Sequence, residues 1–494
     1  MSEQCDMSTS VSSMVVAEGL ADVVAAGPAA AVSRVDAAVR AGVLGRLAGG
    51  EAVVRALERA DHGFVRDRTL TGPVTMLSVL GACLFSGQGY ASVLATVFSV
   101  LARLVPPGTV VPDASAFSQA RARLGEDAMR LLFEQTAADA PPLAAGSTAF
   151  GMEMTAFDGT TLELFADEAL ITEFGVPSGG SNPLVRMVTL VSCGTRRTRA
   201  AVFGAYTTGE QELVDQLAGA LGPGQLNLAD RNFFSMDRWI RFAATGVHLL
   251  WRVKNGSKSL PAKIMKYLPD GSALVRLRES DGMRARRRRA AGDYTLPRLP
   301  ETIARMVEFD LVGVDETGRG KKSRLRLLTT LLDHEAFPAD QIAQVYAERW
   351  QVELSYLRLK KTLRGAGTVL RGRSVALVRQ EIWAFLIVYN ALCDLAAEAA
   401  ALDGIDPDEI SFVAVLRLAR SAVAADVSCR HCGNRPNTTS GQLNDLLYDI
   451  LAHPRNRADR QRTGPRTATE RRTGHTRNVK YNIETVTSNL PKAA

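Results

Sequence analysis

Cysteine is scarce in this chain, and long uninterrupted apolar runs are missing. Six cysteines in 494 residues are too few for a disulfide scaffold and are typical of a reducing compartment, so we expect a cytoplasmic protein. The longest apolar run, Ala384 to Leu392, falls short of the ~18 residues that cross a bilayer, so no membrane partner is expected. The N-terminus has no basic stretch ahead of an apolar one, and no signal peptide is expected.

Charged residues are in modest supply, at 22%, but the basic ones are unevenly distributed. A hydrophobic content of 46% is enough to build a core and excludes global disorder. The net charge is only +7, yet arginines cluster in a block at 284–289 and in a tail at 455–480. Clustered arginine is typical of polyanion binding, because neutralised phosphates release their counterions. A solvated loop and a disordered tail are the alternative for the two clusters.

The pattern of apolar residues divides the chain into six parts. Residues 1–35 are rich in Ala, Val and Ser without periodicity, and we expect them to be disordered. Helical patterns change to period-two patterns near residue 147, and long helical patterns return after Pro338. This order indicates an α/β core interrupted by a β-rich segment. The other five parts are a helical domain (36–146), a first core segment (147–246), a β-rich insertion (247–337), a second core segment (338–400) and a C-terminal region with the basic tail (401–494).

Two aspartates follow apolar strand patterns. Asp158 lies in AFDGT and Asp230 in NLADRNF, each near the end of an expected strand. Carboxylates at strand ends of an α/β sheet point into the crevice where sites form, and Glu353 on a later helix can join them. Three close carboxylates raise each other's pKa unless cations compensate them. A pair of divalent cations would compensate these negative charges. Two such cations also promote in-line attack on a phosphodiester.

The helix expected from Pro338 to about Leu363 carries four polar residues on one face. In YAERWQVELSYLRLKK, Tyr346, Arg349, Glu353 and Lys360 fall within roughly a 60° arc at ~100° per residue. A plainer interpretation is a solvent-exposed face stabilised by salt bridges, because Arg349 and Glu353 stand four residues apart.

FDGT, LADRNF and Y-x2-R-x3-E-x6-K, in this order, resemble the three catalytic blocks of bacterial insertion-sequence transposases of the insertion-sequence-four family, with its YREK signature. The resemblance covers about residues 40 to 400. It implies an RNase H-like core with a β-rich insertion ahead of the catalytic glutamate. Two sets of site residues are implied: Asp158, Asp230 and Glu353 as metal-binding acids, and Tyr346, Arg349 and Lys360 as DNA-gripping residues. Arg231, directly after the second acid, is a further candidate for DNA contact.

Two other features allow more than one interpretation. Trp251, in LLWRVK, is a candidate for stacking on a displaced DNA base, as some relatives do, or else a core aromatic of a half-buried strand. The pair Cys429 and Cys432, in CRHC, resembles half of a zinc site, but only His453 follows nearby. Its role stays open.

The resemblance predicts an enzyme of the DDE transposase type. It would bind the terminal inverted repeats of its element through the helical N-terminal domain, cleave the ends and join the 3′-hydroxyl to target DNA. Two Mg²⁺ ions per site are expected, with Mn²⁺ as a substitute in vitro, and a homodimer assembled on double-stranded DNA in the nucleoid. No nucleotide cofactor is expected, because no G-x-x-x-x-G-K-[ST] motif is present. The alternatives are a non-catalytic repressor derived from a transposase and a metal-dependent nuclease of the same fold.

Overall fold

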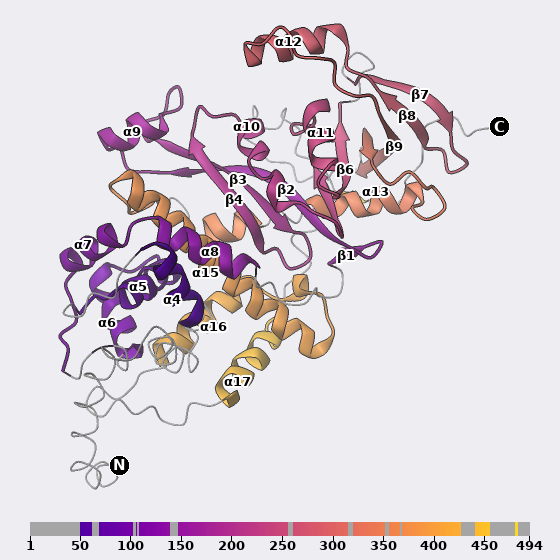
Figure 1. The fold of residues 1–494 in the computed structure, drawn as a ribbon. Coiled ribbons are helices and arrows are strands. Elements are labelled where there is room, and N and C mark those ends of the chain that lie inside the picture. The colour runs from indigo at the N-terminus through magenta and orange to yellow at the C-terminus, as the bar shows by residue number, and fades with distance from the viewer. Residues whose placement is uncertain are drawn as a thin grey trace.

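The computed structural model describes residues 50–61, 69–101, 105, 108–138, 147–254, 260–314, 320–350, 355–365, 368–425, 440–454 and 480–482. Segment 1–35, nearly all of the basic tail, the Cys429 and Cys432 pair and Glu353 lie outside these residues. Figure 1 shows the helices of the N-terminal part at one end of a long sheet and the strands β7 and β8 with α12 at the other.

The N-terminal part is helical, as its periodicity predicts. Its helices are α4 (Gly50–Arg59), α5 (Gly72–Leu84), α6 (Tyr90–Val100), α7 (Ala114–Leu124) and α8 (Asp127–Ala138). The Asp113 carboxylate caps α7 by accepting a hydrogen bond from the amide of Ala116 at 2.7 Å. α7 ends at Gly125, whose φ of 71° is in the left-handed region that favours glycine. This turn divides a segment whose sequence pattern is that of one continuous helix.

Five strands form the centre of the sheet in the order β4-β3-β2-β5-β6. They are β2 (Met152–Glu163), β3 (Leu184–Ser192), β4 (Thr198–Ala205), β5 (Gln225–Ala229) and β6 (His248–Val253), with the short β1 (Thr148–Ala149) paired to β2. β2, β3 and β4 are antiparallel neighbours, whereas β5 pairs parallel to β2 and β6 parallel to β5. This mixed order is the RNase H-like arrangement that the resemblance implies.

The β-rich segment continues the same sheet instead of forming a separate one. β10 (Gly320–Thr329) pairs with β6, and β9 (Thr302–Val314), β8 (Ala273–Leu277) and β7 (Ala262–Tyr267) follow outward. β11 (Lys480–Asn482) adds to β9. The expected start of the insertion at residue 247 falls before β6, which is a central strand. Apolar composition could not separate β6 from the insertion strands, because the pairing partner of a strand, here the parallel neighbour β5, leaves no mark in its composition.

The two faces of the sheet belong to different core clusters. One face packs against α10 (Glu210–Asp215), the 3₁₀ turn Ala218–Ala220 and α11 (Met236–Ala243). The other face packs against α13 (Ala339–Ala347) and α15 (Val375–Asp403). α9 (Glu168–Phe174) contacts β4, and α12 (Asp281–Ala291) lies in the insertion. The face under α13 and α15 is the one on which the site lies.

α15 is a buried core helix. By length and composition it could cross a membrane, but 78% of its most apolar window is buried inside the protein. Its polar side chains have internal partners: the Gln380 amide donates to the carbonyl of Arg121 at 2.9 Å, and the Asn390 oxygen accepts from the amide of Thr198 at 2.8 Å. α15 therefore joins the N-terminal helices to the sheet.

The remaining helices pack on α15 and close the N-terminal side. They are the 3₁₀ turn Pro407–Glu409, α16 (Phe412–Ala425) and α17 (Ser440–Leu451). The turn after α5 contacts the segment ahead of α15: the Ser86 hydroxyl donates to the carbonyl of Leu363 at 2.6 Å, and Arg371 donates to the carbonyl of Ser86. The N-terminal helices and the segment carrying Lys360 are thus directly hydrogen-bonded.

Candidate active site

Asp158 and Asp230 lie next to each other on neighbouring parallel strands. Asp158 lies within β2 (Met152–Glu163), not near its end as predicted, and Asp230 directly follows the end of β5. β2 and β5 pair through Ala156 and Leu228, so two residues further along each strand Asp158 stands beside Asp230. Ala156 and Leu228 belong to the core under α13 and α15. Because side chains alternate along a strand, both aspartates face the same helices. The strand register therefore brings the two carboxylates together.

The backbone after each aspartate orients its carboxylate. The amide of Gly159 donates to Asp158 Oδ1 at 2.9 Å, and the amide of Arg231 donates to Asp230 Oδ1 at 2.7 Å. Both side chains are only partly buried. Each carboxylate thus has a defined direction and keeps access to solvent, as a binding site for a cation requires.

The end of α13 contacts the strand of the second aspartate. The Tyr346 hydroxyl donates to the carbonyl of Ala229 at 3.2 Å, directly before Asp230. Burial raises the pKa of Tyr346 to about 12; the nearby Arg349 lowers it and the charge of Asp230 raises it. The phenol is therefore protonated at neutral pH and acts as a donor. Arg349 lies beside it and is buried as well.

Lys360 contacts the strand of the first aspartate instead. Its ammonium donates to Thr160 Oγ1 at 3.2 Å, two residues beyond Asp158 on β2. Tyr346 and Lys360 therefore lie at opposite sides of the pair of aspartates. Glu353 falls in the segment 351–354, outside the described residues, so its place between them stays a prediction.

The helix that carries these residues is not the regular helix predicted from Pro338 to Leu363. α13 ends at Ala347, a 3₁₀ turn follows (Glu348–Trp350), and a π-helix covers Arg358–Leu363. A 3₁₀ turn advances more than 100° per residue and a π-helix less, so the calculated arc of 60° does not hold. Periodicity could not reveal this, because the apolar residues keep helical spacing throughout. π-Helical turns are frequent at functional sites.

Arg252 is a site residue that was not predicted from the sequence. Its Nη1 lies 3.6 Å from Asp230 Oδ1, and its side chain is only 14% exposed. Burial lowers the pKa of Arg252, against the raising effect of the nearby Tyr346 and Asp230. The alternation of side chains along a strand could have predicted this residue. If Trp251 on β6 points into the core on one face of the sheet, Arg252 must point to the opposite face, where Asp230 lies.

The Glu210 side chain packs closely against the glycine that follows the first aspartate. A Cβ at position 159 would lie 2.6 Å from the Glu210 carboxylate, which occupies that space. Asn232, in the loop after Asp230, donates to Glu210 Oε2 at 2.9 Å. Glu210 thus contacts the polypeptide directly after both aspartates.

Comparison with known proteins agrees with this geometry. A family model described as the insertion element 4 transposase N-terminal region matches residues 38–134, and one described as the transposase DDE domain matches residues 150–391. The chain belongs to the insertion element 4 family of DDE transposases. Its DDE domain begins just before β2, and its N-terminal model ends within α8.

One curated relative is the transposase InsG for insertion sequence element IS4 of Escherichia coli strain K12. The two chains are 30% identical over 306 residues, which cover 60% of the present chain and 64% of InsG. A solved structure of a piggyBac transposase synaptic complex with hairpin DNA matches 91% of this chain and 90% of that chain at 10% identity and a TM-score of 0.40. A likeness at that level supports no argument about the site.

DDE domains of this kind generally use divalent metal ions, and the donor atoms here fit them. Asp158 and Asp230 supply carboxylate oxygens, the ligands that hard divalent cations prefer. Within the described residues no three His, Cys, Asp or Glu side chains group into a metal site. The third acid predicted for the site, Glu353, lies outside those residues.

Trp251 is a core residue, and the prediction that it stacks on a DNA base is wrong. Its side chain is completely buried. The indole packs edge-on against Trp239 and Phe242, and its Nε1 donates to Asn227 Oδ1 at 2.9 Å. β6 lies inside the central sheet, so no base can reach this ring. Arg231 is exposed beside Asp230, and its predicted contact with DNA stays a prediction.

The arginine block at 284–289 is partly structural. It forms α12, in which Arg284 and Arg288 donate to the carbonyl of Leu296 and Arg287 pairs with the buried Glu279. These bonds hold the loop after α12 against the helix. Arg286 and Arg289 are exposed and are available for a polyanion. The block is therefore a helix rather than a solvated loop, and polyanion binding by its exposed arginines stays a prediction.

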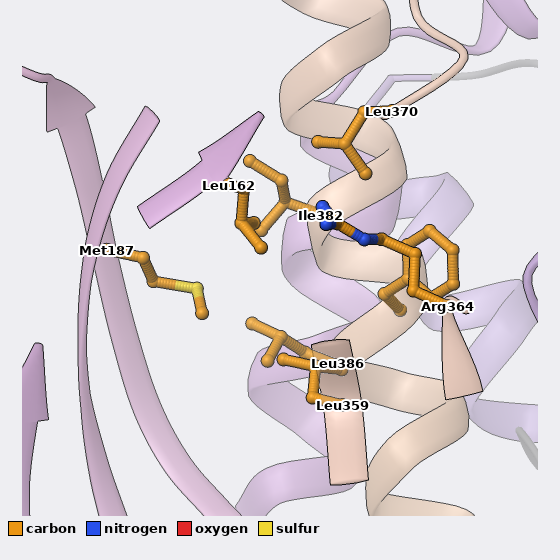
Figure 2. Close-up of a pocket in the computed structure, with 8 residues that line it drawn as sticks. Leu162, Met187, Leu359, Arg364, Leu370, Ile382 and Leu386 are labelled. Atoms are coloured by element: carbon orange, nitrogen blue, oxygen red, sulfur yellow. The ribbon is translucent and has the colours of Figure 1, made fainter. Parts of the chain in front are cut away.

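A small cavity of about 10 Å³ lies beneath the π-helical turn and is lined mainly by apolar side chains of β2, β3 and α15. Figure 2 shows Arg364 reaching among these side chains toward Ile382 and Leu162. A volume of this size holds about one water molecule. The cavity is therefore a gap in the packing under Leu359, not a substrate pocket.

Proposed function

We propose that this chain is the transposase of its own insertion sequence. It binds the terminal inverted repeats of the element, cleaves at the element ends and joins the freed 3′-hydroxyl to target DNA. The observation that carries the proposal is the register of β2 and β5, which sets Asp158 beside Asp230 under the helix of the YREK signature. The family membership supports the same reaction class.

The side chains at this site would divide the work between cation binding and DNA binding. Asp158, Asp230 and Glu353 would hold two divalent cations, Mg²⁺ in the cell and Mn²⁺ as a substitute in vitro. When bound, these ions lower the pKa of the attacking oxygen and stabilise the charge on the leaving oxygen. A phosphodiester near the ions needs further positive charge and hydrogen-bond donors to hold it.

Five basic or hydroxyl-bearing side chains can supply that grip. Arg349 and Arg252 offer guanidinium donors, and Lys360 offers a point charge. The neutral phenol of Tyr346 donates its single proton to the carbonyl of Ala229, so it would grip a phosphate only by exchanging that bond. Arg231, exposed after Asp230, would contact the same DNA strand.

Both chemical steps exchange one bond to phosphorus for another. In the first, a water oxygen bonds to the phosphorus at the element end, its proton passes to solvent, and the bond to the 3′-oxygen of the element breaks. In the second, that 3′-hydroxyl bonds to a phosphorus of target DNA, loses its proton, and displaces the 3′-oxygen of the target strand. No oxidant, nucleotide or covalent enzyme intermediate is needed.

The remaining parts would organise the DNA around this chemistry. The helices α4 to α8 would recognise the inverted repeats, because the N-terminal family model covers them. Two copies would assemble on paired ends of double-stranded DNA, so that both ends are cut together. The protein would work in the cytoplasm on the nucleoid, without a membrane partner.

Glu353→Gln is expected to abolish metal-dependent cleavage while leaving end binding intact, because the amide keeps the shape of the side chain but loses its charge. The test incubates the purified full chain with Mg²⁺, or without metal, and a plasmid carrying the gene's flanking DNA. Breaks that map to an inverted-repeat boundary, and that the variant does not make, establish the reaction. Cleavage retained in the variant contradicts the assignment of the third acid.

Other outcomes of that experiment separate the alternatives. Binding at the boundary without breaks from either protein indicates a repressor. Breaks scattered along the plasmid and lost in the variant indicate a nuclease. Footprinting of the same samples identifies the bound sequence in every case.

The pH dependence of cleavage should show whether the charge of Lys360 is needed for activity. Burial, and then the charges of Arg364 and Lys361, lower the pKa of Lys360. Its ammonium binds phosphate below that pKa and is neutralised as the pH rises through it, so activity should fall earlier on the alkaline side than an exposed lysine would cause. Lys360→Arg stays charged and should move this fall to higher pH. The measurement is cleavage rate against pH, with Lys361→Arg as the control; identical alkaline limbs in wild type and Lys360→Arg contradict the prediction.

A further inference from the structure

One tyrosine outside the signature connects the catalytic helix to the strand of the first acid. Tyr356 lies between the signature residues Glu353 and Lys360 in the sequence, and its side chain is buried. Its hydroxyl lies 2.5 Å from the carbonyl oxygen of Asp158 and 2.8 Å from Thr189 Oγ1. Thr189 stands directly opposite Asp158 on β3. The phenol thus touches both strands at the level of Asp158.

The directions of these hydrogen bonds follow from the groups involved. A carbonyl oxygen can only accept, so the single hydroxyl proton of Tyr356 goes to the carbonyl of Asp158. The Thr189 hydroxyl must then donate to the phenol oxygen. Burial, and next the charge of Asp158, raise the pKa of Tyr356, so the phenol keeps its proton under all working conditions.

The spacing along the helix matches the spacing along the strand. Tyr356 bonds to Asp158 and Lys360 bonds to Thr160, so four residues of the helix correspond to two residues of β2. Residues 356 and 357 are α-helical and residues 358–360 belong to the π-helix, so this correspondence rests on the two bonds and not on an ideal helix rise. The two bonds therefore hold the segment 356–360 in one register along β2, and a slip of the helix would break both.

We propose that Tyr356 is a positioning residue of the active site, whose hydroxyl sets the height of the YREK helix against the strand of Asp158. This inference rests on the proposed transposase function. Tyr356 touches no substrate; it acts by holding Asp158 and Lys360 at a constant separation. Positioning of this kind affects rate strongly, because small misplacements of the reacting groups are costly.

Tyr356→Phe removes the hydroxyl and keeps the ring. We expect cleavage of a pre-cut end duplex under saturating DNA to slow by roughly tenfold, with the Kd for the same duplex changed less than about twofold. The Mn²⁺ concentration for half-maximal rate should rise, because Asp158 is less well placed. Thr189→Val, which removes the donor to the phenol, should change the same quantities in the same direction by a smaller factor.

Tyr389→Phe is the matched control. Tyr389 on α15 is also buried. Its hydroxyl donates to the carbonyl of Arg196 at 3.0 Å and also hydrogen-bonds Ser355, which precedes Tyr356, but neither bond involves an aspartate of the site. Both phenylalanine variants should lose similar thermal stability, but only Tyr356→Phe should need more Mn²⁺. Equal rates and Mn²⁺ requirements in the two variants would overturn the inference.

Calorimetric titration of the full chain with Mn²⁺ tests the inference independently of activity. Weaker Mn²⁺ binding in Tyr356→Phe than in Tyr389→Phe supports the inference even if no duplex is cut. Unchanged Mn²⁺ binding in both variants contradicts it. A wild-type chain that binds Mn²⁺ but never cleaves contradicts the proposed function instead.

Discussion

Asp230→Asn should slow metal-dependent cleavage by about a thousandfold or more, an effect of the same kind as that expected of Glu353→Gln. The amide keeps the size of the side chain and can still accept the hydrogen bond from the amide of Arg231. It removes the negative charge that holds a cation, and it leaves Arg252 facing a neutral group. Binding of the uncut end should persist or tighten, because one repulsive charge near the phosphates is gone.

Single-turnover cleavage of a labelled end duplex, with anisotropy for binding, measures both quantities. Asp237→Asn is the matched control: this aspartate lies on α11, is exposed, and pairs with Arg241 rather than with a site residue. It should cleave at the wild-type rate. A rate for Asp230→Asn within tenfold of wild type would contradict the role of Asp230 as a metal-binding acid.

Trp251→Ala should destabilise the fold by about 3–5 kcal/mol, the range for removing a large buried aromatic. The substitution opens a cavity between Trp239 and Phe242 and leaves the buried Asn227 without its indole donor. We expect a clearly lower midpoint of thermal and urea unfolding, and a smaller loss for Trp251→Phe. Residual DNA binding by the folded fraction should be unchanged.

Tyr294→Ala provides the comparison for Trp251→Ala. Tyr294 is an aromatic residue of the insertion that is 68% exposed, so its removal should leave the unfolding midpoint unchanged. A stable Trp251→Ala protein that fails to bind DNA would restore base stacking and contradict the buried position of the ring.

The order of the elements could be predicted, because it depends on local patterns. Apolar alternation marks β2, β3, β4 and β5, and Asp230 follows the end of β5 as predicted, whereas β2 continues past Asp158 to Glu163. The RNase H-like arrangement could be predicted only from the family resemblance of the ordered FDGT, LADRNF and YREK blocks. The local sequence of a strand does not show which strands it pairs with. β6 was misplaced for that reason: its pairing with β5, not its composition, makes it a core strand.

The path of the catalytic helix could not be predicted from spacing. Apolar residues at helical intervals are compatible with α, 3₁₀ and π turns, because these differ in hydrogen bonds rather than in which face is buried. The packing under Leu359 and Leu363 and the bond from Ser86 to Leu363 occur where the π-helix forms. The hydrogen bond between Lys360 and Thr160 therefore depends on packing against other parts of the chain, not on the local sequence of the helix.

By itself the sequence determined the family, and it predicted which residues carry the chemistry: two aspartates in or after apolar strands and the signature on a helix. Only the tertiary structure decided how they are held. Arg252 faces Asp230 because β6 lies beside β5, and Tyr356 reaches Asp158 because the catalytic helix lies along β2. Such contacts join residues far apart in the chain, and their free energy depends on burial and distance, which no local pattern of residues records.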